Sequence, residues 1–291
     1  MRTSRRWRHV AVAVLAATSA LLILPAPVLA QNVDERISDE AITSFLATYY
    51  KRPDPLRLPA ILKAAQDNGS MKDKARRHLV VGFLAGLIAE DAKYVMTLAP
   101  NFADLPADQP MRLARAIAYS GRTDAGKQTA LLKSLWPMKA AEIEKVAREN
   151  AKPATKLPID TQSLALDLNW GYFGATGRKE PVAAIIAALA GADDKANATR
   201  VANAYQAKLS LAINAMKNDR VLAWCREAQA GPHAAHIKDV LAAVQARDPD
   251  SIRRDGDAAL KAVTRLIEAM AIEKSKPLSP PSAASNAVRA L

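Results

Sequence analysis

Residues 166–177 read Leu-Asp-Leu-Asn-Trp-Gly-Tyr-Phe-Gly-Ala-Thr-Gly, and this segment decides the fold. Apolar residues occupy nearly every side of the helix that it would form, and such a helix is surrounded by protein. Gly177 supplies a turn that ends the helix. We therefore predict a central helix over 162–176, with Asp160 or Thr161 as its N-cap.

The rest of the sequence has helical periodicity and no strand signal. Only 5% of the residues are aromatic, and no stretch alternates β-branched with polar residues as a half-buried strand does. Apolar residues recur at intervals of three and four instead. The sequence therefore predicts an all-α protein.

The predicted helices begin at capping residues or prolines. They run over residues 39–50, 55–67, 71–90, 91–99, 108–120, 124–135, 137–150, 162–176, 181–190, 193–217, 220–229, 233–247 and 256–273. Gly82 and Gly86 lie four residues apart in the apolar run 79–87, which is too short to cross a membrane. Their spacing predicts close packing against another helix.

Several of these segments share a plan in which an apolar helix, a tight turn and an Ala- and Leu-rich helix follow one another. The second helices begin near residues 55, 91, 124, 181 and 220, at spacings of 36, 33, 57 and 39. Three spacings are similar to the period of tetratricopeptide-type hairpins, without the full Trp, Gly, Tyr and Pro signature. We predict stacked antiparallel helical hairpins, tetratricopeptide-like or a related α-solenoid, with a grooved face for a partner.

The first 30 residues have the composition of an export signal. Four arginines precede an apolar run over 10–24, and Val28-Leu29-Ala30 offers a signal-peptidase site. The alternative is an uncleaved membrane anchor, which Pro25 and Pro27 disfavour. We expect cleavage before Gln31, no transmembrane span afterwards, and a periplasmic or secreted location.

The remaining chain is predicted to be one helical domain over 31–273. The loop over 151–160 is either a hinge between two lobes or an ordinary connection, and residues 274–291 are typical of a disordered tail. The formal net charge of +12 falls to about +8 on cleavage, because the signal holds four arginines and no acid. This charge indicates either an ordinary basic surface or affinity for anionic envelope material, rather than for nucleic acid.

No pattern indicates a catalytic residue, a metal or a cofactor. His233 and His236 lie three residues apart, but a zinc site needs a third or fourth ligand, and the nearby sequence offers only Glu227 and Asp239. Residues 121–127 match the spacing of a phosphate-binding loop, yet Gln128 replaces the magnesium-binding hydroxyl and a helix precedes the loop. The single cysteine, Cys225, lies in an apolar helical pattern typical of packing.

The candidate binding residues are aromatic and acidic. Asp167 lies within the central helix, where a buried carboxylate needs either a structural partner or a raised pKa that suits a functional role. We predict a groove lined by Tyr49, Tyr50, Asp167, Trp170 and Tyr172. Its partner is expected to be a protein or peptide segment, or an anionic envelope component.

Two other functions stay open. An envelope-acting hydrolase would use Asp167 as a general acid or base. A peripheral membrane-surface protein would instead use the basic cluster of Lys72, Lys74, Arg76 and Arg77 on anionic lipid.

Two short stretches resemble signatures of a group of uncharacterised bacterial exported proteins. They are residues 45–55, which read Phe-Leu-Ala-Thr-Tyr-Tyr-Lys-Arg-Pro-Asp-Pro, and residues 166–177. The resemblance implies a bacterial, helical, periplasmic protein. It carries no known activity and assigns no catalytic residue.

Overall fold

The computed structural model describes residues 37–102 and 109–275. The predicted signal and all but the first two residues of the predicted tail lie outside these ranges. Inside them the chain forms thirteen α-helices, joined by turns and short 3-10 segments, and no strand. The prediction of an all-α fold is confirmed.

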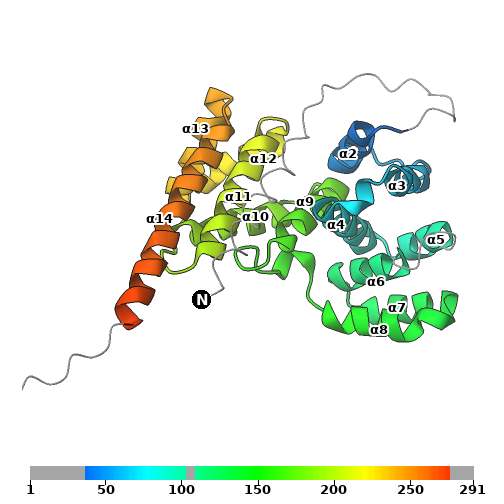
Figure 1. Ribbon diagram of the computed structural model, residues 1–291. Coiled ribbons are helices and arrows are strands. Elements are labelled where there is room, and N and C mark those ends of the chain that lie inside the picture. Colours follow the sequence, from blue (N-terminus) through cyan, green and yellow to red (C-terminus); the bar gives the residue numbers. More distant parts are fainter. Residues whose placement is uncertain (1–36, 103–108, 276–291) are drawn as a thin grey trace, which may run out of the picture.

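The N-terminal helices form successive layers on one side of the molecule (Figure 1). They are α2 (Asp39–Thr48), α3 (Leu58–Asp67), α4 (Lys74–Glu90), α5 (Lys93–Phe102), α6 (Gln109–Tyr119), α7 (Ala125–Leu135) and α8 (Ala140–Glu149). The 3-10 segments among them are η1 (Tyr49–Lys51), η2 (Ser70–Lys72) and η3 (Pro137–Lys139). Ser38 caps α2 as predicted, because its hydroxyl accepts the N–H of Ala41 at 3.2 Å. The α5 helix continues past Pro100, where the prediction ended it.

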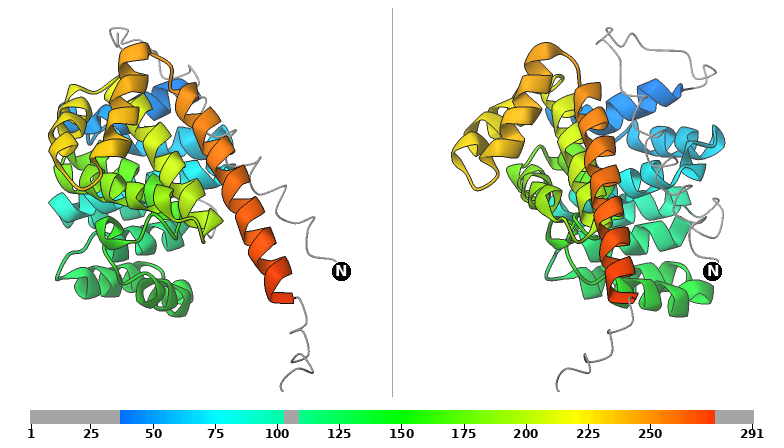
Figure 2. Two further views of the ribbon diagram at one scale, coloured as in Figure 1. Left: turned by 90° about the vertical axis from the view of Figure 1, so that its left-hand side faces the viewer. Right: turned by 60° about the vertical axis from the view of Figure 1, so that its left-hand side comes forward.

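The C-terminal helices form the other side, and α9 lies between the two sides (Figure 1). They are α9 (Leu164–Thr176), α10 (Lys179–Ala187), α11 (Ala198–Ala215), α12 (Asp219–Glu227), α13 (Ala234–Ala246) and α14 (Asp250–Ser275), with η4 (Ala154–Lys156), η5 (Ala188–Asp193) and η6 (Ala228–Ala230). Figure 2 shows the C-terminal end of α14 projecting beyond its neighbours. Among the helices of the described ranges, none is both long and apolar enough for a membrane span.

The central helix α9 belongs to two hydrophobic cores. Leu168 and Tyr172 pack in the core formed by α2–α8, whereas Ala165 and Phe173 pack in the core formed by α10–α14. The central position predicted for this segment is therefore correct.

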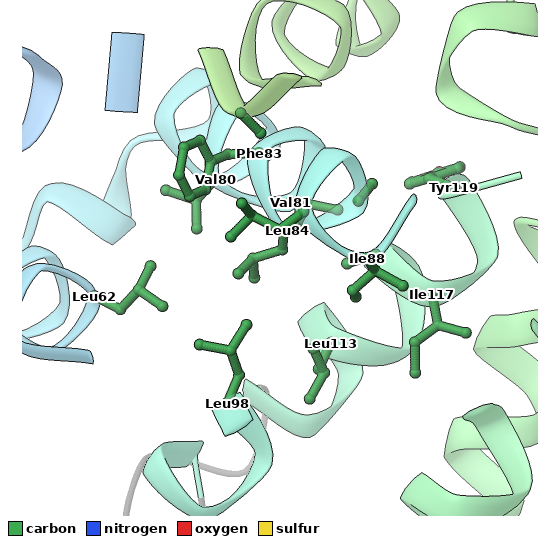
Figure 3. Packing of buried hydrophobic residues seen from close by; sticks show 14 of the residues in the cluster. Leu62, Val80, Val81, Phe83, Leu84, Ile88, Leu98, Leu113, Ile117 and Tyr119 are labelled. Atoms are coloured by element: carbon green, nitrogen blue, oxygen red, sulfur yellow. The ribbon is translucent and has the colours of Figure 1, made fainter. Parts of the chain in front are cut away.

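Figure 3 shows part of the first core. Leu84 and Ile88 of α4 lie near Leu98 of α5 and near Leu113 and Ile117 of α6, and all five side chains are fully buried or nearly so. This core fixes α4 on the side opposite to its contact with α9.

The backbones of α4 and α9 are in direct contact. A Cβ on Gly82 would lie 2.0 Å from the carbonyl oxygen of Leu168, and a Cβ on Gly171 would lie 1.9 Å from that of Leu79. A Cβ on Gly86 would lie 2.8 Å from the Cβ of Ala175 in α9. The close packing predicted from Gly82 and Gly86 is therefore confirmed, because no larger residue fits.

This contact joins helices that are distant in the sequence. The pairing of α4 with α9 is the most extensive helix contact in the described chain, and it skips α5–α8. In an α-solenoid each repeat contacts only its neighbours. The tetratricopeptide-like stacking predicted from the helix spacing is not confirmed.

The N-termini of α11 and α9 are among those that differ from the prediction. The helix predicted over 193–217 begins later, because the Asn197 side chain accepts the N–H of Arg200 at 3.1 Å and caps α11 there. Neither Asp160 nor Thr161 caps α9. The Asp160 carboxylate instead accepts a hydrogen bond from Arg200 Nε at 2.8 Å.

The last helix is longer than predicted. It was expected over 256–273, but α14 begins at Asp250 and ends at Ser275, which makes the first two residues of the predicted tail helical. Gly256 lies inside the helix, where a Cβ would be 3.0 Å from the Cβ of Tyr205. This glycine permits a close approach to α11 and does not start the helix.

The connection over 151–160 is attached to both cores. Ala154 is buried in the first core, and its carbonyl oxygen accepts a hydrogen bond from Asn169 Nδ2 at 3.1 Å. Ile159 is buried in the second core. The connection is thus anchored at two points, and a division into lobes there stays a prediction.

Candidate functional site

A cavity of about 160 Å³ lies where α2 and α4 meet α9 and α11. Most of its wall is apolar and comes from Ile42 and Leu46 of α2, Leu79 and Val80 of α4, Leu166, Trp170 and Phe173 of α9, and Ile213 of α11. Apolar cavities of roughly 150 Å³ bind benzene. The space therefore fits a compact molecule of about one ring.

Asp167 is the unpaired acid of this cavity. It is partly buried, and it makes no hydrogen bond or ion pair with any residue that the structure describes. Burial and the negative charge of Asp73 raise the pKa of Asp167 from its ordinary 3.8 to about 7, while the positive charge of Lys74 acts in the opposite direction. The carboxyl therefore titrates closer to neutral pH than an exposed aspartate does.

Trp170 lines the cavity one helical turn after Asp167. Its ring packs edge-on against Phe173, with 5.9 Å between the ring centroids, and the two rings form an aromatic wall. The indole N–H is buried and has no hydrogen-bond partner among the described residues. Unpaired buried donors are rare in folded proteins. Two polar groups of α9 at this cavity thus lack partners.

Two charged residues at the N-terminal end of α4, Asp73 and Arg76, line the same cavity. Arg76 Nη1 lies 2.6 Å from Asp39 Oδ2 and 2.9 Å from Ser70 Oγ, so its charge is matched. Asp73 caps α4 by accepting the N–H of Arg76 at 2.8 Å and forms no ion pair with a described residue. Once Asp167 is ionised, negative charge exceeds positive charge at the cavity.

The structure brings together two of the five predicted binding residues. Asp167 and Trp170 both line the cavity. Tyr49 is buried in the first core, where its hydroxyl lies 3.3 Å from that of Tyr94, and Tyr172 is buried in the same core. These two tyrosines hold helices together and do not reach the cavity.

Tyr50 makes a different contact, between η1 and α12. Its hydroxyl accepts a hydrogen bond from Asn218 Nδ2 at 2.9 Å, and its ring lies 5.2 Å from that of Phe173. The Arg220 guanidinium also lies 5.2 Å from the Tyr50 ring. Tyr50 therefore fastens the N-terminal helices to the C-terminal ones.

The prediction lacks two polar residues of α11 that line the cavity, Ser210 and Asn214. Ser210 Oγ donates to the carbonyl oxygen of Ala207 at 2.9 Å, and Asn214 Nδ2 donates to that of Ser210 at 2.8 Å. Residues four positions apart in a helix share one face. The spacing therefore indicates that these two side chains lie together, but it does not show that they face a cavity.

The other candidate groups have structural surroundings. His236 Nε2 lies 2.9 Å from Asp193 Oδ2, and within the described ranges no three metal-ligating side chains are grouped. Cys225 is fully buried, and burial raises the pKa of its thiol to about 11. A thiol in such surroundings is unreactive, which agrees with the predicted packing role.

Comparisons with known proteins did not identify a relative of this chain. No protein-family model matches the chain, and no curated protein or solved structure is detectably similar to it. The function must therefore be argued from the cavity and from the sequence.

Proposed function

We propose that the protein is an exported protein of the bacterial envelope that binds a small, largely apolar ligand in the cavity between α2, α4, α9 and α11. The observation that carries this proposal is the unpaired Asp167 carboxyl at an apolar wall. A polar group in such a place costs stability unless something pairs with it. The first 30 residues and the two resembling stretches support the envelope location.

The hydrolase alternative has less support. A carboxyl with a pKa of about 7 suits proton transfer near neutral pH. Hydrolysis also needs an activated nucleophile or a second acid, however. The lining hydroxyls of Ser70 and Ser210 already donate to Asp39 and to the carbonyl oxygen of Ala207, and no His that could activate them occurs among the described lining residues. The other lining acid, Asp73, caps α4.

The membrane-surface alternative is also weaker. Arg76 is paired with Asp39, and Arg77 Nη1 donates to the carbonyl oxygens of Met71 and Lys72. Two of the four basic side chains in the cluster are thus occupied within the protein.

Isothermal titration calorimetry with benzyl alcohol tests the proposal. This neutral probe has one ring and matches the size of the cavity. The full chain is expected to bind it saturably at one site. In the variant Ala75→Leu, which extends a lining side chain of α4 into the space, binding should be lost.

The matched control is Ala141→Leu, which makes the same change at an exposed position of α8. It should bind benzyl alcohol like the original protein. Absence of saturable binding by the original protein, or equal affinity in Ala75→Leu, would overturn the proposed function.

A further inference from the structure

We infer that the ligand of this cavity is a small organic cation, namely an amine carried by an apolar body of about one ring. The inference rests on the proposed binding function and adds the chemical class of the ligand. It follows from the charge balance, the wall and the size of the cavity.

The charge balance favours a cation. Arg76 already has the carboxylate of Asp39 at 2.6 Å, so it offers little to an anionic ligand. Asp73 and Asp167 both line the cavity, and neither has an ion-pair partner among the described residues. A ligand ammonium group would supply the missing charge and donate a charge-assisted hydrogen bond to Asp167.

The aromatic wall favours the same class. Trp170 and Phe173 stand in α9 beside Asp167 and line the cavity. The faces of aromatic rings attract ammonium groups, and the attraction is stronger where water is excluded. A carboxylate beside aromatic rings therefore suits an amine better than a neutral or anionic ligand.

The surroundings of Asp167 predict how affinity depends on pH. The charged groups around it come from α4 and are Asp73, Lys74 and Arg76, since the lining residues of α2 and α11 carry no titratable side chain. The pKa of Asp167 in the unbound protein is about 7. The preference for an amine should thus increase as the pH rises from 5.5 to 8, while the amine itself stays protonated.

Three probes with one skeleton test the inference: benzylamine, benzyl alcohol and benzoate, titrated by calorimetry at pH 8 and pH 5.5. At pH 8 benzylamine should bind about tenfold more tightly than benzyl alcohol, the gain typical of a charge-assisted hydrogen bond. Benzoate should bind most weakly. At pH 5.5 the advantage of benzylamine over benzyl alcohol should shrink.

The variant Asp167→Asn should lose the preference for benzylamine over benzyl alcohol. The control Asp73→Asn removes the other lining carboxylate and keeps a good capping residue for α4, so it should change the preference less than Asp167→Asn does.

The two proposals fail in different ways. Equal affinity for benzylamine and benzyl alcohol, tighter binding of benzoate, or an unchanged preference in Asp167→Asn would overturn the cation inference and leave the binding function standing. If none of the three probes binds, the proposed function fails and the inference fails with it.

Discussion

Two neighbouring regions of α9 are packed in opposite ways. Toward α4 and α2, a Cβ on Gly171 or Gly174 would lie 1.9 Å or 2.2 Å from a backbone oxygen. Next to these glycines, Asp167 and Trp170 border a cavity of about 160 Å³, whose wall also includes residues of α2 and α4. Protein interiors are close-packed, and this helix achieves backbone contact within one turn of the open space. The difference indicates that the cavity is a specific feature and not a general looseness of the core.

Two polar residues of α9 also differ from each other, in whether their side chains have hydrogen-bond partners. Asn169 is fully buried, and its amide donates to the carbonyl oxygens of Ala154 at 3.1 Å and Ala165 at 2.7 Å. Asp167, two residues earlier, has no such partner. Asn169 therefore holds the fold together, whereas Asp167 is available to a ligand.

The largest effect is expected where the packing is tightest. Gly171→Ala places a methyl group against the backbone of α4, so the free energy of unfolding should fall by about 3 kcal/mol or more. Urea unfolding followed by circular dichroism measures this change. The control Gly126→Ala meets nothing within 4 Å and should instead gain about 0.5 kcal/mol, because Ala is the better helix former. Similar stabilities of the two variants would mean that α4 and α9 are not in backbone contact.

An intermediate effect is expected for Asp167→Asn, which should raise the free energy of unfolding at high pH instead of lowering it. The pKa of Asp167 is raised on folding, so the native state holds this proton more tightly, and stability is lost as the pH rises from about 4 through 7. The variant Asp167→Asn cannot ionise and should be more stable than the original protein at pH 8, by about 2 kcal/mol, with a smaller difference near pH 4. Urea unfolding between pH 4 and pH 8 measures both curves. Parallel curves would show that this carboxyl is as well solvated when folded as when unfolded.

The smallest effect is expected from filling the cavity. Ala75→Leu adds carbon atoms to a lining position of α4, the same helix that carries Gly82, and should raise the free energy of unfolding by about 1 kcal/mol. Thermal unfolding monitored by circular dichroism suffices to detect it. At the exposed Ala141 the same change should stay within about 0.5 kcal/mol. Marked destabilisation by Ala75→Leu would mean that this side of α4 has no room.

Much of the fold could be predicted from local patterns. Capping residues such as Ser38 and turns such as Gly177 mark helix ends, and Gly82 with Gly86 indicates a close helix contact. The partner of that contact could not be predicted, because glycine spacing shows that a backbone approaches and not which one. The hairpin pattern favoured a neighbour, whereas the structure uses α9.

The candidate site was only partly predictable for a geometric reason. Successive residues of an α-helix are rotated by about 100°, so Trp170 lies about 60° from Asp167 around α9, and Tyr172 lies about 140° away. In the structure Tyr172 packs in the first core. The angle alone does not exclude it, because Phe173 lies about 120° from Asp167 and lines the cavity. The contribution of Ser210 and Asn214 depends on how α11 is placed against α9, which no local pattern specifies.

The pairing of α4 with α9 also has a consequence for the order in which the chain can fold during synthesis. The two helices are separated by α5–α8, so α4 has no cover for its glycine side until α9 has been made. Contacts between segments far apart in the sequence form slowly, because a long loop must close first. We therefore expect the nascent chain to stay open until α9 has left the ribosome, with neither core complete before that moment.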